Sequence, residues 1–175
     1  REKKRTQMER DAEETIGALR ERMARQSERQ VLDKFGPGPH RVEIEFLVPS
    51  TDDGPDATTT EYVVVETAPL DLMPHSVHLF LNQVSKGVWD NTEIHKNREH
   101  ILLTRPSDAI TGRDKFSDFL EAGVESLGYR EHSDRYPHVQ YTLGYVGTNL
   151  GPHWYVNKMD NSRWHGPDAE SGDEG

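Results

Sequence analysis

Apolar residues recur at two different spacings along the chain, and the change of spacing separates a charged helical part from a strand-rich part. In residues 1–34 sparse apolar positions follow at three- and four-residue steps among good helix formers, which predicts one long helix. These positions are Met8, Ala12, Ile16, Leu19, Met23 and Val31. The stripe is thin, so a solvent-exposed stalk is favoured, while a coiled coil that self-associates through this helix stays open. Residues 35–39, Phe-Gly-Pro-Gly-Pro, end any helix and predict a domain boundary.

From residue 40 onward the spacing becomes two, which is typical of strands with one buried face. We expect strands at residues 41–48, 61–66, 101–104, 140–146 and 153–157. A Gly/Pro/Asp/Thr loop separates the first two, and a glycine-bounded turn at 147–151 joins the last two. The folded domain is therefore expected at residues 40–167, followed by an acidic, disordered tail at 168–175.

Residues 73–96 predict a short helix, a stop, a turn and a strand. Pro74 suits a first helical turn, where its missing N–H would have no partner. The apolar stripe of this helix is Val77, Phe80, Leu81 and Val84. Gly87 supplies the left-handed residue that closes a helix, and the strand after it ends in a histidine and a lysine.

The connection at residues 105–138 is long, and connections of this length usually carry function or a family-specific insertion. Its apolar residues have helical spacing at Phe116, Phe119, Leu120, Val124 and Leu127, and Gly128 is expected to close the helix.

Composition and charge narrow the choice of partners. The chain has 175 residues, 33% hydrophobic residues, a mean hydropathy of −0.87 and a net charge of −10. The charge is uneven: residues 1–35 hold 10 basic and 8 acidic residues, and the remainder holds 11 basic and 23 acidic ones. An acidic body argues against nucleic acid as a partner, because phosphates require a basic surface.

Other features bear on compartment and metal binding. The chain has no cysteine, so it has neither disulfides nor thiolate metal ligands. No apolar run approaches the roughly 20 residues that span a bilayer, and no signal peptide is visible. Because the chain starts at Arg1, we expect a fragment or a processed form, and a stalk before a folded domain is compatible with a membrane-tethered or secretory-pathway protein. The nine histidines are scattered without a zinc motif, so we interpret them as structural or surface residues and expect no metal.

Strand, loop, strand and the helix with its following strand resemble the opening of the cyclophilins, the peptidyl-prolyl cis-trans isomerases. The resemblance spans roughly residues 41–166 and implies a mainly β fold: an antiparallel β-barrel with a capping helix, here preceded by the stalk. The family continues with further elements, so the resemblance implies a C-terminally incomplete barrel.

The resemblance also implies a set of site residues. Ile94-His95-Lys96 matches the family's Phe-His-Arg, which places Lys96 at the catalytic arginine and His95 beside it. Ile101, Leu102 and Thr104 stand for Phe-Met-x-Gln, and residues 142–147 resemble Thr-Leu-Ser-Met-Ala-Asn. The substrate-binding residues implied in this way are His95, Ile101, Leu102, Thr104, Val146, Gly147, His153, Tyr155 and Trp164.

The function implied is isomerisation of X–Pro bonds in peptide or protein segments, without a cofactor. The barrier of about 18–20 kcal/mol falls when a pocket grips the proline ring and a donor stabilises the twisted prolyl nitrogen. Lysine keeps a positive donor but loses the planar fork of arginine, so weak activity is expected. The alternative is a catalytically inactive peptide-binding or scaffold module on a helical stalk.

Overall fold

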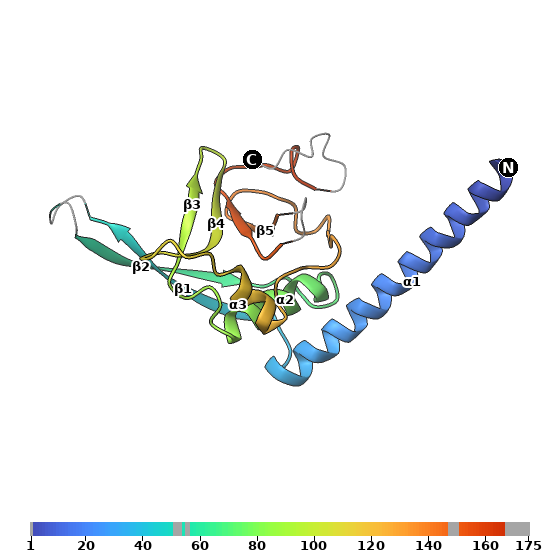
Figure 1. Cartoon of the computed structure of the whole chain (residues 1–175), viewed down its shortest axis with the longest axis horizontal. Coiled ribbons are helices and arrows are strands. Elements are labelled where there is room, and N and C mark those ends of the chain that lie inside the picture. Colours follow the sequence, from blue (N-terminus) through green and yellow to red (C-terminus); the bar gives the residue numbers. More distant parts are fainter. Residues whose placement is uncertain (1, 51–53, 55–56, 147–150, 167–175) are drawn as a thin grey trace.

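The computed structural model describes residues 2–50, 54, 57–146 and 151–166. The helices are α1 (Glu2–Phe35), α2 (Pro74–Ser85) and α3 (Phe116–Ala122). The strands are β1 (Arg41–Pro49), β2 (Thr58–Glu66), β3 (Thr92–Asn97), β4 (Ile101–Asp108), β5 (Leu143–Tyr145) and β6 (Trp154–Asn157). Figure 1 shows α1 extending from one side of the strands and the β1–β2 ribbon extending from the other.

The strands form two separate sheets, so the prediction of a cyclophilin-like barrel is wrong. β1 and β2 make an antiparallel two-stranded ribbon, and the second sheet has the order β3-β4-β6-β5. A closed barrel needs every strand to have a neighbour on both sides. Among the described strands, β1 and β2 pair only with each other, and β5 is three residues long. The described residues therefore make a mixed α/β fold of three helices and two small open sheets.

Several element ends differ from the expected ones for local reasons. β5 covers Leu143–Tyr145 rather than residues 140–146, because Tyr141 has a φ of 68° and turns the chain out of extended conformation. α3 ends at Ala122 and is closed by Gly123, with a φ of 66°, rather than by Gly128. β4 runs on to Asp108, past the expected end at 104. Gly87, with a φ of 62°, follows the end of α2 as expected.

The predicted long helix is confirmed as α1, and only its last turns are packed. Val31 is fully buried against Leu70, Val77 and Leu81. Lys34 Nζ donates to Asn82 Oδ1 at 2.9 Å, which adds a polar contact to α2. The apolar positions of the first two-thirds of α1 are exposed, namely Met8, Ile16 and Leu19. Self-association through α1 therefore stays a prediction.

His75 joins α1, α2 and the segment after α3 in one hydrogen-bonded contact. Its Nδ1 lies 3.0 Å from Ser27 Oγ, its Nε2 contacts the Leu127 carbonyl, and its ring stacks on Tyr129. A neutral imidazole protonated on Nε2 satisfies both partners, because it donates to the carbonyl and accepts from the hydroxyl. This contact fixes the segment that follows α3, which forms one wall of the pocket described below.

The main core lies between α2, α3 and the segment after α3. It contains the buried residues Leu79, Val88, Phe119, Val124 and Leu127. Gln83 is completely buried within it, and its Oε1 accepts from Trp89 Nε1 at 3.0 Å and from the Tyr145 hydroxyl at 2.9 Å. Its Nε2 donates to the Val124 carbonyl at 2.9 Å. A buried amide with three partners links α2 to β5 and so positions the strand that borders the pocket.

Candidate functional site

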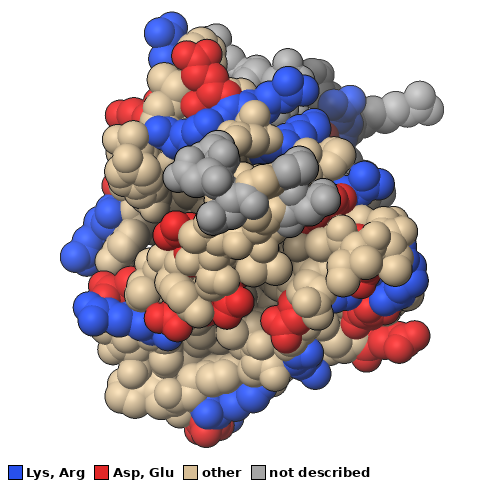
Figure 2. Space-filling model, turned by 90° about the vertical axis from the view of Figure 1, so that its left-hand side faces the viewer, with Lys and Arg blue, Asp and Glu red and all other residues tan. Residues whose placement is uncertain are grey.

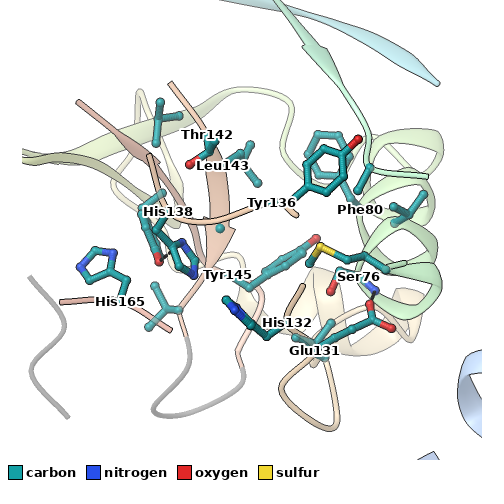
Figure 3. Close-up of a pocket in the computed structure, with 18 of the residues that line it drawn as sticks. Ser76, Phe80, Glu131, His132, Tyr136, His138, Thr142, Leu143, Tyr145 and His165 are labelled. Atoms are coloured by element: carbon teal, nitrogen blue, oxygen red, sulfur yellow. Dashed lines mark hydrogen bonds between the residues drawn. The ribbon is translucent and has the colours of Figure 1, made fainter. Parts of the chain in front are cut away.

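A pocket of about 970 Å³ lies between α2, the end of β2, the second sheet and the segments at 127–138 and 164–166. Its volume is within the range of ligand sites. Figure 3 shows Tyr145 near the middle of the view, Phe80 and Ser76 of α2 on one side, and His132, His138 and His165 toward the other. The pocket therefore combines residues from distant parts of the sequence, from Arg20 of α1 to Gly166.

Apolar and aromatic side chains form the floor on the second sheet. Ile101, Val146 and Tyr155 are buried together, and Leu103 packs against them. Ile101 and Leu103 reach the same cluster because alternate residues of a strand share a face. Gly144 lies under the Tyr155 ring, where an added Cβ would come within 3.0 Å of the phenol. The glycine thus gives the ring the room to lie flat along the pocket wall.

Two further aromatic residues, Tyr136 and Trp164, line the mouth and are exposed at 42% and 55%. Arg163 lies over the Trp164 ring at 5.0 Å from its centroid. Aromatic faces at a mouth are typical of sites that bind apolar rings, including those of proline.

Three histidines cluster on the side of the pocket near residues 132–138 and 165. The His138 ring centroid lies 6.1 Å from that of His132 and 5.6 Å from that of His165. Burial, then the neighbouring His165 and His132, lower the pKa of His138 to about 4, and burial also lowers the pKa of His165. These two imidazoles are therefore neutral at pH 7.

The neutral state of His138 fits its contact with Tyr155. The Tyr155 hydroxyl and His138 Nδ1 are 3.2 Å apart, so an imidazole protonated on Nε2 accepts the hydroxyl proton. The two rings are also nearly parallel, with an interplanar angle of 24°. The pair gives the floor of the pocket a fixed aromatic surface.

Glu131 lies in the wall but is used by α2. Its two carboxylate oxygens accept from the backbone N–H groups of His75 at 3.2 Å and Ser76 at 2.7 Å. α2 lacks a side-chain cap of its own at Met73, so Glu131 satisfies two of the open N–H groups at its start. The carboxylate is therefore a structural group that holds the 127–138 segment to α2.

Lys96 is half-buried on β3 and lines the pocket. Among the described residues its ammonium makes no hydrogen bond or ion pair. A cation beside an apolar, aromatic floor can donate to a carbonyl or amide group of a bound molecule.

The pocket brings together half of the residues implied by the resemblance. Those that line it are Lys96, Ile101, Val146, Tyr155 and Trp164. Four others lie outside it: His95 is exposed on β3, and the remaining three are Leu102, Thr104 and His153. Gly147 lies outside the described residues.

Strand alternation and local bonding explain these placements. Leu102 lies between Ile101 and Leu103 and therefore projects from the other face of β4. Thr104 is buried, and its hydroxyl donates to the Trp154 carbonyl at 2.7 Å and accepts from the Trp154 N–H at 3.1 Å. Thr104 thus joins β4 to β6 and has no hydroxyl proton left for a ligand.

Sequence reasoning missed the residues that the 127–138 segment contributes. His132, Tyr136 and His138 line the pocket, although the histidines were interpreted as structural or surface residues. The sequence feature that pointed to this segment was the unusual length of the 105–138 connection. That length indicated a functional segment, but it did not identify which of its residues line a pocket. No spacing in the sequence could place His138 against Tyr155.

Within the described part of the chain, no group of three or more His, Cys, Asp or Glu side chains is arranged to hold a metal ion. Of the described helices, none has the length and apolar character to cross a membrane. Comparison with protein-family models, with curated proteins and with solved structures finds no match for this chain.

Proposed function

We propose that this protein binds extended, proline-containing segments of peptides or proteins in the pocket between α2 and the second sheet. The observation that carries the proposal is the aromatic and apolar lining, in which Ile101, Tyr155 and Trp164 surround a space large enough for several residues. Proline-rich segments are already extended before binding, and they dock in aromatic-lined grooves at low cost in conformational entropy. The cation of Lys96 at the pocket wall supplies a donor for a peptide carbonyl.

Binding without turnover is favoured over catalysis because the polar groups expected around the peptide are not in the pocket. Thr104 uses its hydroxyl within the sheet, and His95 and His153 do not line the space. A site that grips apolar rings but holds the peptide backbone weakly stabilises the ground state and the twisted state about equally, which does not accelerate rotation.

A direct binding measurement tests the proposal. A blocked pentapeptide Ala-Val-Pro-Val-Ala should bind more tightly than Ala-Val-Ala-Val-Ala in a calorimetric titration. Trp164→Ala should weaken that binding about five- to tenfold, which is the loss of roughly 1 kcal/mol of ring contact. Ile110→Ala is the matched control, because Ile110 is 88% exposed and does not line the pocket. Equal affinity for the two peptides, or an unchanged affinity in Trp164→Ala, would contradict the proposal.

Isomerisation of the bound X–Pro bond is the second candidate, and the observation that favours it is the position of the Lys96 ammonium, which has no partner among the described residues. A donor that strengthens as the bond twists would lower the barrier. Exchange between cis and trans peptide measured by NMR would then be accelerated by wild type, slower with Lys96→Ala and faster with Lys96→Arg. Lys86→Ala, an exposed lysine after α2, is the control. An absence of acceleration in wild type and in Lys96→Arg would rule this candidate out.

A further inference from the structure

We propose that the free edge of β2 is part of the ligand site, so that an extended segment binds as an added strand along β2 while its side chains reach the pocket. This inference rests on the proposed function, because it specifies the backbone conformation and the chemistry of the segment that the pocket accepts. It does not depend on whether the bound X–Pro bond is turned over.

The first observation is that β2 has an open side. The ribbon has β1 on one side of β2, in a regular register from Arg41 opposite Glu66 to Pro49 opposite Thr58. On the other side, no backbone group of β2 hydrogen-bonds to any other part of the described chain. An unpaired edge presents a row of N–H and C=O groups that can pair with another extended segment. A two-stranded ribbon is also marginal by itself and gains stability from a third strand.

The second observation is that this open edge borders the pocket. The lining includes consecutive residues at the end of β2, namely Val63, Val64, Val65 and Glu66, and continues into Thr67 and Ala68. Val63 and Val64 are 48% and 58% exposed, although valine is usually buried. No residue of β1 lines the pocket. A strand added along β2 would therefore run beside the aromatic floor, and its alternate side chains would enter the pocket.

The edge of β1 is protected in a way that the edge of β2 is not. β1 carries Arg41, Glu43 and Glu45 at alternate positions and ends in Pro49, and charged residues and proline both discourage further pairing. β2 carries only β-branched residues and tyrosine between its two glutamates, which are the residues that favour strands. The ribbon is therefore open to pairing on its pocket side.

Charge defines the chemistry of the added segment. The two strands contain four carboxylates, Glu43, Glu45, Glu61 and Glu66, against one cation, Arg41, which is paired with Glu66 at 2.8 Å. Figure 2 faces the side from which the ribbon extends and shows broad uncharged areas between scattered acidic and basic side chains. On β2 itself, Glu66 is the carboxylate paired with Arg41, which leaves Glu61 to meet an added strand. The pocket, in contrast, is lined by the cations of Arg20, Lys96 and Arg130. The segment that fits is therefore extended, has alternating apolar side chains that enter the pocket, and carries lysine or arginine where it runs along Glu61, outside the pocket.

Methylation of single peptide nitrogens tests the backbone pairing directly. The probe is the blocked heptapeptide Lys-Val-Lys-Val-Pro-Val-Lys, titrated against the full chain. In an added strand only every second N–H faces β2. Methylation of a nitrogen whose N–H faces β2 should weaken binding about tenfold or more. Methylation of a nitrogen at the alternate positions, whose N–H points away from β2, should change binding little. Amide hydrogen exchange at alternate residues of β2 should slow when the peptide binds, while the outer amides of β1 serve as the internal control.

The outcomes separate this inference from the proposed function. In the first outcome, Trp164→Ala weakens binding, but methylation has the same effect at both alternating sets of nitrogens and the amide hydrogen exchange of β2 is unchanged. The inference is then wrong and the proposed function stands. If neither this peptide nor the proline pentapeptide binds, both are wrong. If β2 amides are already protected without peptide in a concentration-dependent manner, a second copy of the chain occupies the edge and the inference is also wrong.

Discussion

Acidification should destabilise the fold through His138, whose ring is held neutral at the centre of the histidine cluster. In the folded protein the pKa of His138 falls from 6.5 to about 4, through burial first and then through His165 and His132. The unfolded chain keeps the ordinary pKa. Between these two values the unfolded state therefore binds a proton that the folded state does not, and stability falls as the pH falls.

The size of the effect follows from the same two values. Each unit of pKa difference is worth about 1.36 kcal/mol, so the upper limit is about 3 kcal/mol. His138 is only partly buried, so solvent screening reduces the expected contribution to about 2 kcal/mol. This stability is fully present above pH 6.5, decreases as the pH falls toward 4, and does not change further through His138 below that pH. The pKa of His165 and that of His78 are also lowered by burial, so these residues add losses of the same sign.

Urea unfolding at pH 7 and pH 4.5 measures the effect, with wild type beside His138→Gln. The glutamine cannot be protonated, so the difference between the two pH values should shrink by about 2 kcal/mol in the variant. His95→Gln is the matched control, because His95 is exposed on β3 and should keep the wild-type difference. An NMR titration of the His138 ring gives the folded-state pKa directly. A ring that titrates near pH 6.5, or a variant with the wild-type pH dependence, would refute the reasoning.

Three further substitutions test the packing around the pocket. Val31→Ala should destabilise the fold by about 2 kcal/mol in urea unfolding, since it opens a cavity where α1 meets α2, while the exposed neighbour Leu32→Ala should cost less than about 0.5 kcal/mol. Glu131→Gln should cost about 1 kcal/mol by the same assay, because the uncharged amide caps the two N–H groups at the start of α2 more weakly. Gln83→Leu should cost about 2 kcal/mol or more, since it leaves the Tyr145 hydroxyl and the Val124 carbonyl without their buried partner. A cost below about 0.5 kcal/mol for any of these three substitutions at Val31, Glu131 and Gln83 would contradict the contact assigned to that residue.

The sequence predicted the elements whose causes are local. α2 begins at Pro74 and is followed by Gly87, as proline geometry and the left-handed glycine require. The charged helix is present as α1, and the alternation after residue 40 gives β1. Val84 was placed on the buried stripe of α2 and is instead 40% exposed, while Gln83 occupies the core. A buried glutamine cannot be predicted from a hydrophobic pattern, because its burial depends on partners 6, 41 and 62 residues away.

The sheet arrangement could not be predicted for a different reason. The order of strands along the chain is compatible with one barrel or with two sheets, and the choice depends on which edges pair. The resemblance implied the strand pairing of the cyclophilins for this chain. That expectation is wrong at β1 and β2, which pair only with each other among the described strands. The residue types of an edge strand indicate whether it tolerates pairing with another strand, but they do not determine which strand of the chain pairs with it.

The same open edge connects the error in the fold prediction with the site. In a closed barrel the inward side chains of β2 and β4 would fill one core. In two separate sheets, Val63 of β2 and Ile101 and Leu103 of β4 border a space of about 970 Å³ instead. The apolar surface left in contact with water lies mainly on the β2 side, where Val63 and Val64 are exposed while Ile101 is buried, and it costs roughly 25 cal/mol for each Å². A segment that enters the space recovers this energy, and an unpaired strand edge beside it favours a segment that is extended. In the proposed function, the separation of the sheets therefore accounts for the volume, and the exposed valines of β2 account for part of the driving force.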